Sequence, residues 1–500
     1  MTSLLTGLTV VFTPFNIMLL VCGVILGAVM GCIPGLTGLM AITLIIPVTY
    51  YMDMNAALVL LLGIYNGGIY GGSISAILLG TPGAACAGPT VFDGYPMAQQ
   101  GRSGKALRMA LYCSAIGCFT SCLVLCNLAR PVSRLALYFG PSEYTLLILL
   151  ALTMVGSVAG ESMIKGLICG FFGILLSTVG MDPLATVSRF TFGNYKLLTG
   201  LGNIPVLIGL LAIPQIMVQI EKMPLEREAG ASQSLLPPPS CRDDERVTWK
   251  DFKKCLPTIG ISAFIGWFFG ALPALGATPA AYFGYDIAKK RSKNGNNFGK
   301  GEVEGVAAAE TANNATVGSS FVPLLAFGIP GDSNTAVLIG AFLLHGITIG
   351  PNIFTNRPDT VGTIYAALMC SNIVLVIVMS LLLKFFAKVA KAPKSVIFPF
   401  VVMSCCIGVY AVSQNSFDVW LLIIFSVIGY LMMRFGFPTT PTLVGFLLGE
   451  TFERNLRQAL LISHNDLTYF FSSTIDIIMW VAIVISIVSI ALSKRRGKRA

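Results

Sequence analysis

Asp332, Ser333 and Asn334 are the side chains of this sequence best suited to hold a small ion at a break in an apolar segment. They lie in the stretch AFGIPGDSNTAV, residues 326–337, whose Gly and Pro residues interrupt a run that could otherwise cross a membrane. A second stretch, LGTPGAACAGPT at 79–90, carries nearly the same interruption. All three side chains are good helix N-caps, and Asp332 as a cap would stabilise the following helix by about 1 kcal/mol.

Other polar residues lie within long hydrophobic stretches. Glu310, Asn313 and Asn314 are examples, and polar groups at membrane depth are costly and usually face a cavity. They also serve as interhelical hydrogen-bond partners, and Glu310 fits such an interface equally well. The residues that we assign as candidate cation ligands are Asn66, Ser73, Asn313, Asn314 and Asp332.

The composition identifies the class of protein that must position these side chains. Of the 500 residues, 55% are hydrophobic and 11% are charged, and the mean hydropathy is +0.79. A soluble domain has roughly a quarter charged residues. We therefore predict an all-α polytopic membrane protein with about 11–13 transmembrane segments, since one span needs about 20 apolar residues. The first apolar segment has no basic region before it and no cleavage site, so we expect a membrane segment and not a signal peptide.

Charge and cysteine content exclude other classes. The net charge is +10, but Lys and Arg lie in loops and at the C-terminal tail, as in membrane proteins, without the aromatic–basic pattern of a nucleic-acid groove. Four of the 13 cysteines, Cys113, Cys118, Cys122 and Cys126, could share one helix face. No His or Asp accompanies them, so helix packing explains them better than a metal site. We expect no nucleic-acid partner and no bound metal.

One polar stretch divides the chain. Residues 221–255 contain seven basic and seven acidic residues and three consecutive prolines, so they are too charged to enter lipid. We predict a first membrane repeat at 1–220, a polar linker at 221–255, and a second membrane repeat with C-terminal helices and a basic tail at 256–500.

Two short motifs recur on either side of the linker. GCIPGLTG at 31–38 resembles GALPALGA at 270–277, and GTPG at 80–83 resembles GIPG at 328–331. The second pair has an offset of 248, and at that offset Asn66 corresponds to Asn314. Interrupted segments at corresponding positions of two halves are typical of secondary transporters.

Loop charges predict that the two repeats are inverted. Residues 48–57 contain no Lys or Arg, whereas the equivalent residues 286–304 contain five. After the second break the bias reverses, with three basic residues in 94–108 and one in 347–362. Basic loops face the cytoplasm, so equivalent loops face opposite sides of the membrane.

An inverted repeat brings four helix breaks together near the midplane. Irregular backbone is tolerated there only where it is buried or lines a cavity. The unpaired N–H groups of each half-helix suit an anion. The residues that we therefore predict to bind substrate are Gly35, Thr37, Gly38, Thr81, Pro82, Gly83, Ala274, Gly276, Thr278, Gly331, Ser333 and Asn334.

Longer motifs resemble the large permease subunit of tripartite tricarboxylate transporters, the TctA family. The resembling stretches are GCIPGLTG, IYNGGIYGGSISAILLGTPG, DGYPMAQQGRSGKALRMA, FGKGEVEGVAAAETANNATVGSSFVPLLAFGIPG and LLHGITIGP. The resemblance implies import of a di- or tricarboxylate across the bacterial inner membrane, driven by a gradient of Na⁺ or H⁺. It also implies a small membrane subunit and a periplasmic solute-binding protein as partners.

This chain departs from the family pattern at two places. The second-half break reads Pro273-Ala274-Leu275-Gly276 where the family has Pro-Gly followed by Gly, and Asp332 stands where small residues are usual. An acid at this point repels an anion unless it caps a helix or binds the coupling cation.

Two other functions remain as alternatives. In an intramembrane aspartyl protease Asp286 and Asp332 would be the catalytic pair, but that class needs the motif Gly-x-Gly-Asp at the second aspartate, and Ile329 stands where the first Gly is required. A passive anion channel would not need repeated helix breaks. We therefore expect a transporter with no catalytic residues and no cofactor other than the coupling ion. The sequence leaves the oligomeric state open, a homodimer included.

The inverted topology leads to a first prediction. Single cysteines placed in 94–108 and 286–304 of a cysteine-reduced background should react only from the cytoplasm, and those in 48–57 and 347–362 only from the periplasm, because basic loops are retained inside. Labelling with a membrane-impermeant maleimide in whole cells tests this. Periplasmic labelling of residues 286–304 would exclude the inverted arrangement.

Overall fold

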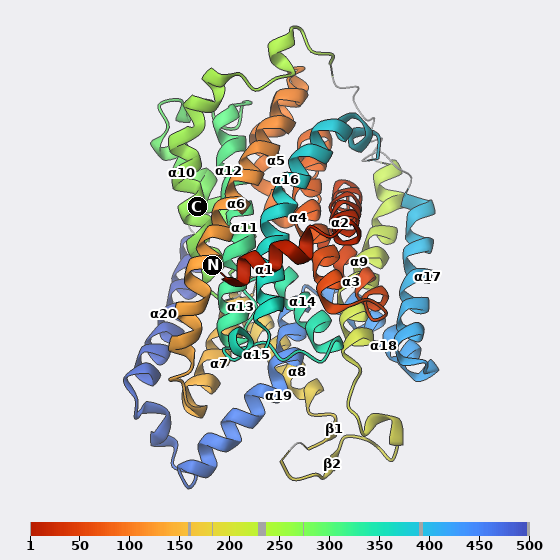
Figure 1. The fold of residues 1–500 in the computed structure, drawn as a ribbon, viewed down its shortest axis with the longest axis vertical. Helices are drawn as coiled ribbons and strands as arrows, with labels where there is room; N and C mark the ends of the chain where they lie inside the picture. Colours follow the sequence, from red (N-terminus) through yellow and green to blue (C-terminus); the bar gives the residue numbers. More distant parts are fainter. Residues whose placement is uncertain are drawn as a thin grey trace. The chain divides into compact units, whose positions relative to one another are not determined.

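The chain is almost entirely helical. The computed structural model describes residues 2–158, 162–182, 184–228, 237–273, 275–389 and 394–497. The elements before the linker are α1 (Thr2–Val11), α2 (Pro14–Cys32), α3 (Gly38–Thr49), α4 (Met54–Leu79), η1 (Ala85–Ala87), α5 (Gly88–Gln99), α6 (Ser103–Ala136), α7 (Pro141–Val158), α8 (Met163–Ser177), β1 (Gly180–Met181), β2 (Ser188–Arg189), η2 (Tyr195–Leu197) and α9 (Asn203–Glu228) (Figure 1).

The label η denotes a short 3₁₀ helix, and further elements follow α9. They are η3 (Arg242–Asp244), α10 (Trp249–Ala271), α11 (Ala277–Arg291), η4 (Gly295–Asn297), α12 (Val303–Ser319), α13 (Phe321–Phe327), α14 (Ser333–Leu344), α15 (Ile353–Asn356), α16 (Pro358–Val389), α17 (Lys394–Ser413), α18 (Ser416–Arg434), α19 (Thr439–Ile462), η5 (Leu467–Phe471) and α20 (Thr474–Gly497).

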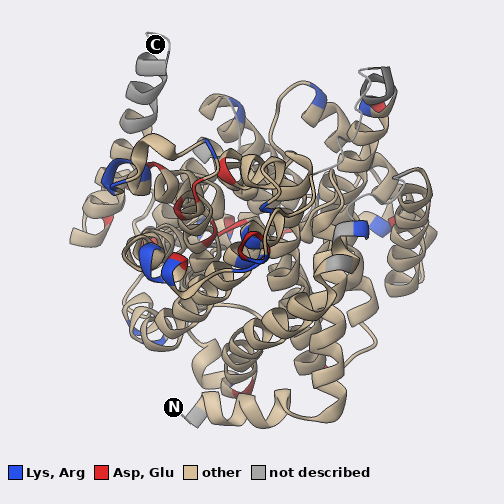
Figure 2. Cartoon of the chain, turned by 90° about the horizontal axis from the view of Figure 1, so that it is seen from above, with Lys and Arg blue, Asp and Glu red and all other residues tan. Residues whose placement is uncertain are grey.

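Many of these helices suit a membrane. Within the described residues, eight are long and apolar enough to cross one, judged by length and composition: α2, α4, α6, α9, α10, α16, α17 and α18. Five shorter apolar helices accompany them, namely α3, α7, α8, α14 and α20. Figure 2 shows the charged residues as short coloured stretches on a mostly uncharged ribbon. The predicted all-α polytopic fold is confirmed, and the number of 11–13 spans stays a prediction. The small antiparallel ribbon of β1 and β2 was not predicted.

Each motif that the sequence marks as a break separates two helices. α2 ends at Cys32 and α3 begins at Gly38, with the Thr37 side chain accepting a hydrogen bond from Met40 N. α4 ends at Leu79, and its C-cap Gly80 has a φ of 68°, which is left-handed and favours glycine. In the second half, α10 ends at Ala271 and α11 begins at Ala277, and the C-cap of α13 is Gly328 with a φ of 74°.

The helices around the breaks pack in the same order in both halves. α2 packs on α4 and α3 on α4, just as α10 packs on α12 and α11 on α12. Contacts also cross between the halves, because α14 packs on α3 and α5 packs on α11. The second-break helix of each half thus contacts the first-break helix of the other. The opposite orientation of the halves across the membrane remains a prediction.

The chain forms two compact units, and each uses residues from both sides of the linker. The first comprises residues 1–132 and 215–408, and it contains all four helix breaks. The second comprises 133–214 and 409–500. These units differ from the predicted repeats, which divide the chain by sequence at the linker. The repeat boundaries remain a prediction.

The second unit has its own core and its own ion pairs. Val206 and Leu210 of α9 pack with Leu421, Phe425 and Phe446. Near the β ribbon, Arg457 Nη1 donates to Asp182 Oδ2 at 2.7 Å, and Arg189 Nη1 donates to Glu453 Oε1 at 2.6 Å. Hydrogen bonds from the Ala185 N–H, the Arg457 guanidinium and the Leu184 N–H hold the pKa of the Asp182 carboxyl well below its usual value. The ribbon is therefore joined to α19 by charge pairs.

Close approach of α2 and α4 in the first unit depends on glycines. A Cβ added to Gly27 would lie 2.2 Å from Ile64 O, and one on Gly67 would lie 2.2 Å from Val24 O. Small residues at facing positions are the usual way in which membrane helices achieve such contact. The same device recurs where Gly266 of α10 meets Ala312 of α12.

A glycine substitution tests this packing. Gly27→Ala should lower the thermal unfolding midpoint of the detergent-solubilised protein, because the backbone oxygen of Ile64 cannot move aside without separating two helices. Overpacking of this kind costs about 1–3 kcal/mol. Gly260→Ala on α10 is the control, since a Cβ there meets nothing within 4 Å. Equal midpoints for the two variants would contradict the proposed role of the glycine stripe.

Candidate functional site

The first break of the first half is shaped by two glycines and a cap. Gly35 has a φ of 92°, and a Cβ at this position would collide with the Gln219 side chain. Thr37 caps α3, and Gly38 lies against Gly68 of α4, where a Cβ would be 2.8 Å from Gly68 Cα. These predicted substrate residues therefore also fix the turn and its contact with α4.

The second break of the first half lies beside the first. Gly83 is buried, and a Cβ on it would lie 2.3 Å from Gly31 O and 2.8 Å from Gly72 Cα. Its N–H donates to Gly72 O at 3.2 Å, so this backbone donor is already paired. Thr81 and Pro82, just before it, are exposed.

The breaks of the second half lie together in the same way. Gly276 has a φ of 66°, and a Cβ on it would lie 3.1 Å from Asp332 Cβ. Gly331 packs closely against Ser320, because a Cβ on Gly331 would lie 2.6 Å from Ser320 Cα. Thr278 and Ser333 are half-buried at the first turns of α11 and α14. Ala274 lies outside the described residues.

Asp332 is the most heavily hydrogen-bonded residue of the breaks. Its Oδ1 accepts from Thr335 N at 2.8 Å and from Thr335 Oγ1 at 2.7 Å, which makes it the N-cap of α14. Its Oδ2 accepts from Tyr65 OH of α4 at 2.7 Å and from Asn334 Nδ2 at 3.3 Å. The expected capping role is confirmed. Four donors already surround the carboxylate, so its geometry suits a cap better than a cation ligand.

A second carboxylate, Glu310 of α12, is completely buried. Thr90 Oγ1 of α5 donates to its Oε1, and Ser114 Oγ of α6 donates to Oε2 at 2.9 Å. Asn314 Nδ2 lies 3.4 Å from Oε2 and 3.0 Å from Ser114 Oγ. Hydroxyl and amide groups from three helices therefore converge on this one carboxylate.

Polar atoms with unused hydrogen-bonding capacity surround Glu310. Among the described residues, Ser73 Oγ and both side-chain polar atoms of Asn313 have no hydrogen bond of normal geometry, and both residues are fully buried. Ser73 nevertheless interacts electrostatically with Glu310, and Asn313 interacts with Cys86 of η1. Cys86 itself lies within electrostatic range of both Glu310 and Asp332.

Asn66 and Asn314, which the repeat pairs with each other, make equivalent contacts. Asn66 Nδ2 donates to Ser371 Oγ of α16 at 2.9 Å, whereas Asn314 Nδ2 donates to Ser114 Oγ of α6. Each asparagine thus links its helix to the long helix of the other half. The predicted cation ligands fall into separate groups. Ser73 and Asn314 interact with Glu310, and Asn313 of the same helix interacts with Cys86. Asp332 lies beside Tyr65, and Asn66 contacts α16.

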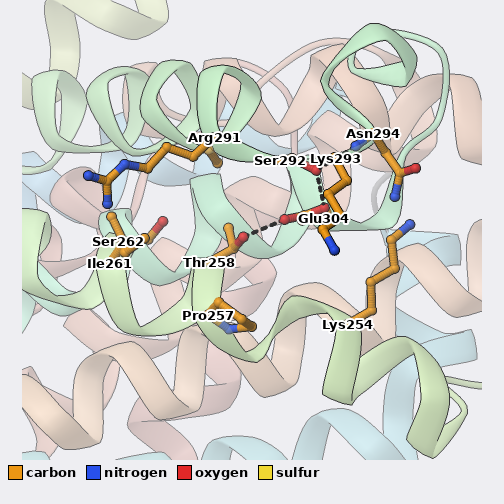
Figure 3. Close-up of a pocket in the computed structure, with 11 residues that line it drawn as sticks. Lys254, Pro257, Thr258, Ile261, Ser262, Arg291, Ser292, Lys293, Asn294 and Glu304 are labelled. Carbon is orange, nitrogen blue, oxygen red and sulfur yellow. Dashed lines mark hydrogen bonds between the residues drawn. The ribbon is translucent and has the colours of Figure 1, made fainter.

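A third buried carboxylate, Glu304, offers a useful comparison. It accepts hydrogen bonds from Thr258 Oγ1 and Ser292 Oγ beside a cavity of about 520 Å³ (Figure 3). The same cavity is lined by Lys254, Arg291 and Lys293, so positive charge lies close to Glu304. Lys105, one of the three basic residues in 94–108, pairs with Asp251 of α10 at 3.1 Å. Within the described part of the chain, no group of three His, Cys, Asp or Glu side chains could hold a metal.

Sequence reasoning missed several of these partners. Tyr65 and Ser114 have no motif of their own, and Thr90 lies just past a recognised break. Glu310 did stand out by its apolar surroundings but was not assigned to the site. The cost of a carboxylate at membrane depth was the one signal that pointed to it.

Residues 17–444 match the model of the family described as tripartite tricarboxylate transporter TctA family. The chain is 34% identical over 497 residues, 99% of its length and 97% of the relative, to an "Uncharacterized 52.8 kDa protein in TAR-I ttuC' 3'region" of Agrobacterium vitis. It is 37% identical over 230 residues, 46% of its length and 95% of the relative, to an "Uncharacterized protein in TAR-II ttuC' 3'region" of that organism. No solved structure matches.

The Tyr65–Asp332 contact can be tested by a double-mutant cycle. Tyr65→Phe and Asp332→Asn should each lower the unfolding midpoint. Together they should lower it by less than the sum of the two effects, because each substitution removes the same hydrogen bond. A bond to a charged group contributes about 1.5–3 kcal/mol. Asp332→Ala should cost a further ~1 kcal/mol, since Asn caps α14 and Ala does not. Additive effects of the first two substitutions would show that the contact contributes nothing.

Proposed function

Since the chain belongs to the tripartite tricarboxylate transporter TctA family, we propose that it is a permease that imports a di- or tricarboxylate, driven by a cation gradient. Membership of this family and the many apolar helices make it a multi-pass membrane protein of a transporter family. The proposal adds a small membrane subunit and a periplasmic solute-binding protein as partners, and the bacterial inner membrane as the location.

The arrangement of the helix breaks carries this proposal. Each half has two breaks that lie side by side, as at Gly31 and Gly83 and at Gly276 and Asp332. The helices beyond the breaks then contact across the halves, α14 with α3 and α5 with α11. Broken helices of this kind at matched positions are the usual substrate and ion sites of secondary transporters. All four lie in one compact unit.

The proposed substrate site lies at the half-helix tips. Ser333 and Asn334 form the first turn of α14, where helix N–H groups and the helix dipole favour an anion. Both side chains are half-buried. They directly follow Asp332, which packs against the turn at Gly276. In this proposal the substrate is held by dipoles, hydroxyls and amides from the twelve tip residues named above.

Asp332 fits this site as a cap. Its two oxygens accept four hydrogen bonds, two of them from Thr335 and one from Tyr65, so its charge is dispersed over donors of α14 and α4. This lowers its repulsion of an anion bound one turn away. The cap also orders the N-terminal turn that would bind the substrate.

The protease alternative is not supported by the surroundings of the two aspartates. Such an enzyme needs two facing carboxyl groups. Asp286 has a side chain that is 56% exposed and forms an ion pair with Lys290 on its own helix. Asp332 is buried and bound to Tyr65. A passive channel remains distinguishable from a transporter by uphill accumulation of substrate.

Uptake measurements test the proposed site. In proteoliposomes that contain the small subunit, with the solute-binding protein outside, citrate and other carboxylates should accumulate only under an inward Na⁺ or H⁺ gradient. Ser333→Ala and Asn334→Ala should each weaken uptake roughly ten-fold, near 1.4 kcal/mol for one lost hydrogen bond. Asp332→Asn should retain uptake if the residue only caps.

Two matched controls accompany these variants. Ser404 of α17 and Asn127 of α6 bond only to carbonyl oxygens of their own helices, Phe400 O and Leu123 O respectively. Ser404→Ala and Asn127→Ala should transport at the unmodified rate. Full uptake by the Ser333 and Asn334 variants would move the substrate site elsewhere, and equilibration without accumulation would identify a channel.

A further inference from the structure

Glu310 presents an electrostatic problem that its known contacts do not solve. The carboxylate is completely buried on α12, and within the described residues no Lys, Arg or His forms an ion pair with it. Its hydrogen-bond partners, Thr90, Ser114 and Asn314, are all neutral. A buried charge is strongly unfavourable unless a counter-charge accompanies it. The site therefore needs one positive charge that the described protein groups do not supply.

The atoms around Glu310 are of the kind that bind an alkali cation. Ser73 Oγ, Asn313 Oδ1 and Asn314 Oδ1 are buried oxygens without a hydrogen bond. Leaving such a group unpaired costs about 1–3 kcal/mol. Asn313 stands one helical turn from Glu310, and residues three apart on a helix are neighbours. Ser73 of α4 interacts directly with the carboxylate.

We propose that Glu310, Thr90, Ser73 and Asn313 form a binding site for one monovalent cation of the size of Na⁺. A hydroxyl oxygen has two lone pairs, so Thr90 and Ser73 can turn their protons away and bind the ion. One carboxylate and three neutral oxygens balance a single positive charge. Divalent cations take six or more oxygens and commonly several carboxylates, so they fit this set poorly.

A proton would solve only part of the problem. Protonation would neutralise Glu310 and give it an O–H that can donate to Ser73, but it would leave Asn313 Oδ1 without a hydrogen bond. A bound metal ion uses the Ser73 and Asn313 oxygens at once. The buried Asn313 oxygen without a hydrogen bond is the observation that favours a cation site over a buried carboxylic acid.

The position of the site links it to the helix breaks. Thr90 stands in the first turn of α5, directly after η1 and the Gly83 turn, whereas Glu310 and Asn313 stand on α12. A cation held by these residues would fasten the first-half break to the second half. Cys86 of η1, between the Gly83 turn and Thr90, interacts electrostatically with both Glu310 and Asp332. Coupling of the cation to transport rests on the proposed function, and the binding itself does not.

Glu304 provides a matched control on the same helix. It is a buried glutamate that also accepts from two hydroxyl groups, those of Thr258 and Ser292. Unlike Glu310, it borders a cavity that Lys254, Arg291 and Lys293 also line (Figure 3). Glu304→Gln thus removes a buried carboxylate that lies beside a cavity lined by basic side chains.

The test measures Na⁺ binding by the purified chain in detergent. Thermal unfolding is followed in NaCl and in choline chloride at equal ionic strength, and binding of radioactive Na⁺ is measured in parallel. Na⁺ should raise the unfolding midpoint in a saturable manner, since a ligand that binds only the folded state stabilises it. Glu310→Gln should abolish both signals, while Glu304→Gln should retain them. Asn313→Ala and Ser73→Ala should each weaken Na⁺ affinity on the order of ten-fold.

Each outcome decides between explanations. Absence of saturable Na⁺ binding by the unmodified protein, or its retention in Glu310→Gln, would overturn the site, and so would stabilisation that depends on pH but not on Na⁺. If Glu310→Gln does not fold, unchanged affinity in Asn313→Ala and Ser73→Ala would overturn it equally. Na⁺ binding without carboxylate uptake would support the site and contradict the proposed function, whereas Na⁺-independent uptake without Na⁺ binding would do the reverse.

Discussion

The pairing of backbone polar groups in apolar surroundings is the constraint on which this structure depends. Four helices are interrupted within the first compact unit, and lipid offers no hydrogen bonds to the groups that each interruption frees. The chain satisfies them in different ways. Thr37 caps α3, Asp332 caps α14, and Gly83 donates to Gly72 of the preceding helix. Glycines then permit the close contacts that keep water and lipid away from these groups.

The same constraint explains why the polar side chains lie where they do. Tyr65, Asn66, Glu310 and Asn314 project from α4 and α12, the two central helices, whose residues are almost all buried. Each reaches an element that comes from the other half of the sequence. Asn66 reaches α16, Asn314 reaches α6, and Tyr65 reaches the Asp332 turn. These hydrogen bonds join the halves where hydrophobic contact alone would give little orientation.

Local features of this arrangement could be predicted from the sequence, and long-range partners could not. Gly and Pro motifs located all four breaks, and Asp332 was correctly interpreted as a cap, because caps and turns depend on residues close in sequence. The Glu310 cluster combines residues 73, 90, 114, 310, 313 and 314, and no periodic pattern connects positions so far apart. Asn66 and Asn314 correspond to each other in the repeat and were both assigned as candidate cation ligands, but the two asparagines face different long helices.

Equivalent positions of the two repeats carry different side chains. At the offset of 248, Tyr65 corresponds to Asn313, Ala84 to Asp332, Cys86 to Asn334, and Leu62 to Glu310. One pseudo-equivalent site therefore has a tyrosine that donates to an acid on the break itself. The other has the Asn313 amide, whose polar atoms lack hydrogen bonds of normal geometry, and Cys86 after the break. Its acid, Glu310, lies on the central helix α12 and not on the break. In the first site hydrogen-bond donors alone surround the carboxylate, and in the second the donors are accompanied by buried oxygens that have no hydrogen bond of normal geometry. In the proposed function, these two dissimilar sites bind two different ions, an anion at the capped tip and a cation beside Glu310.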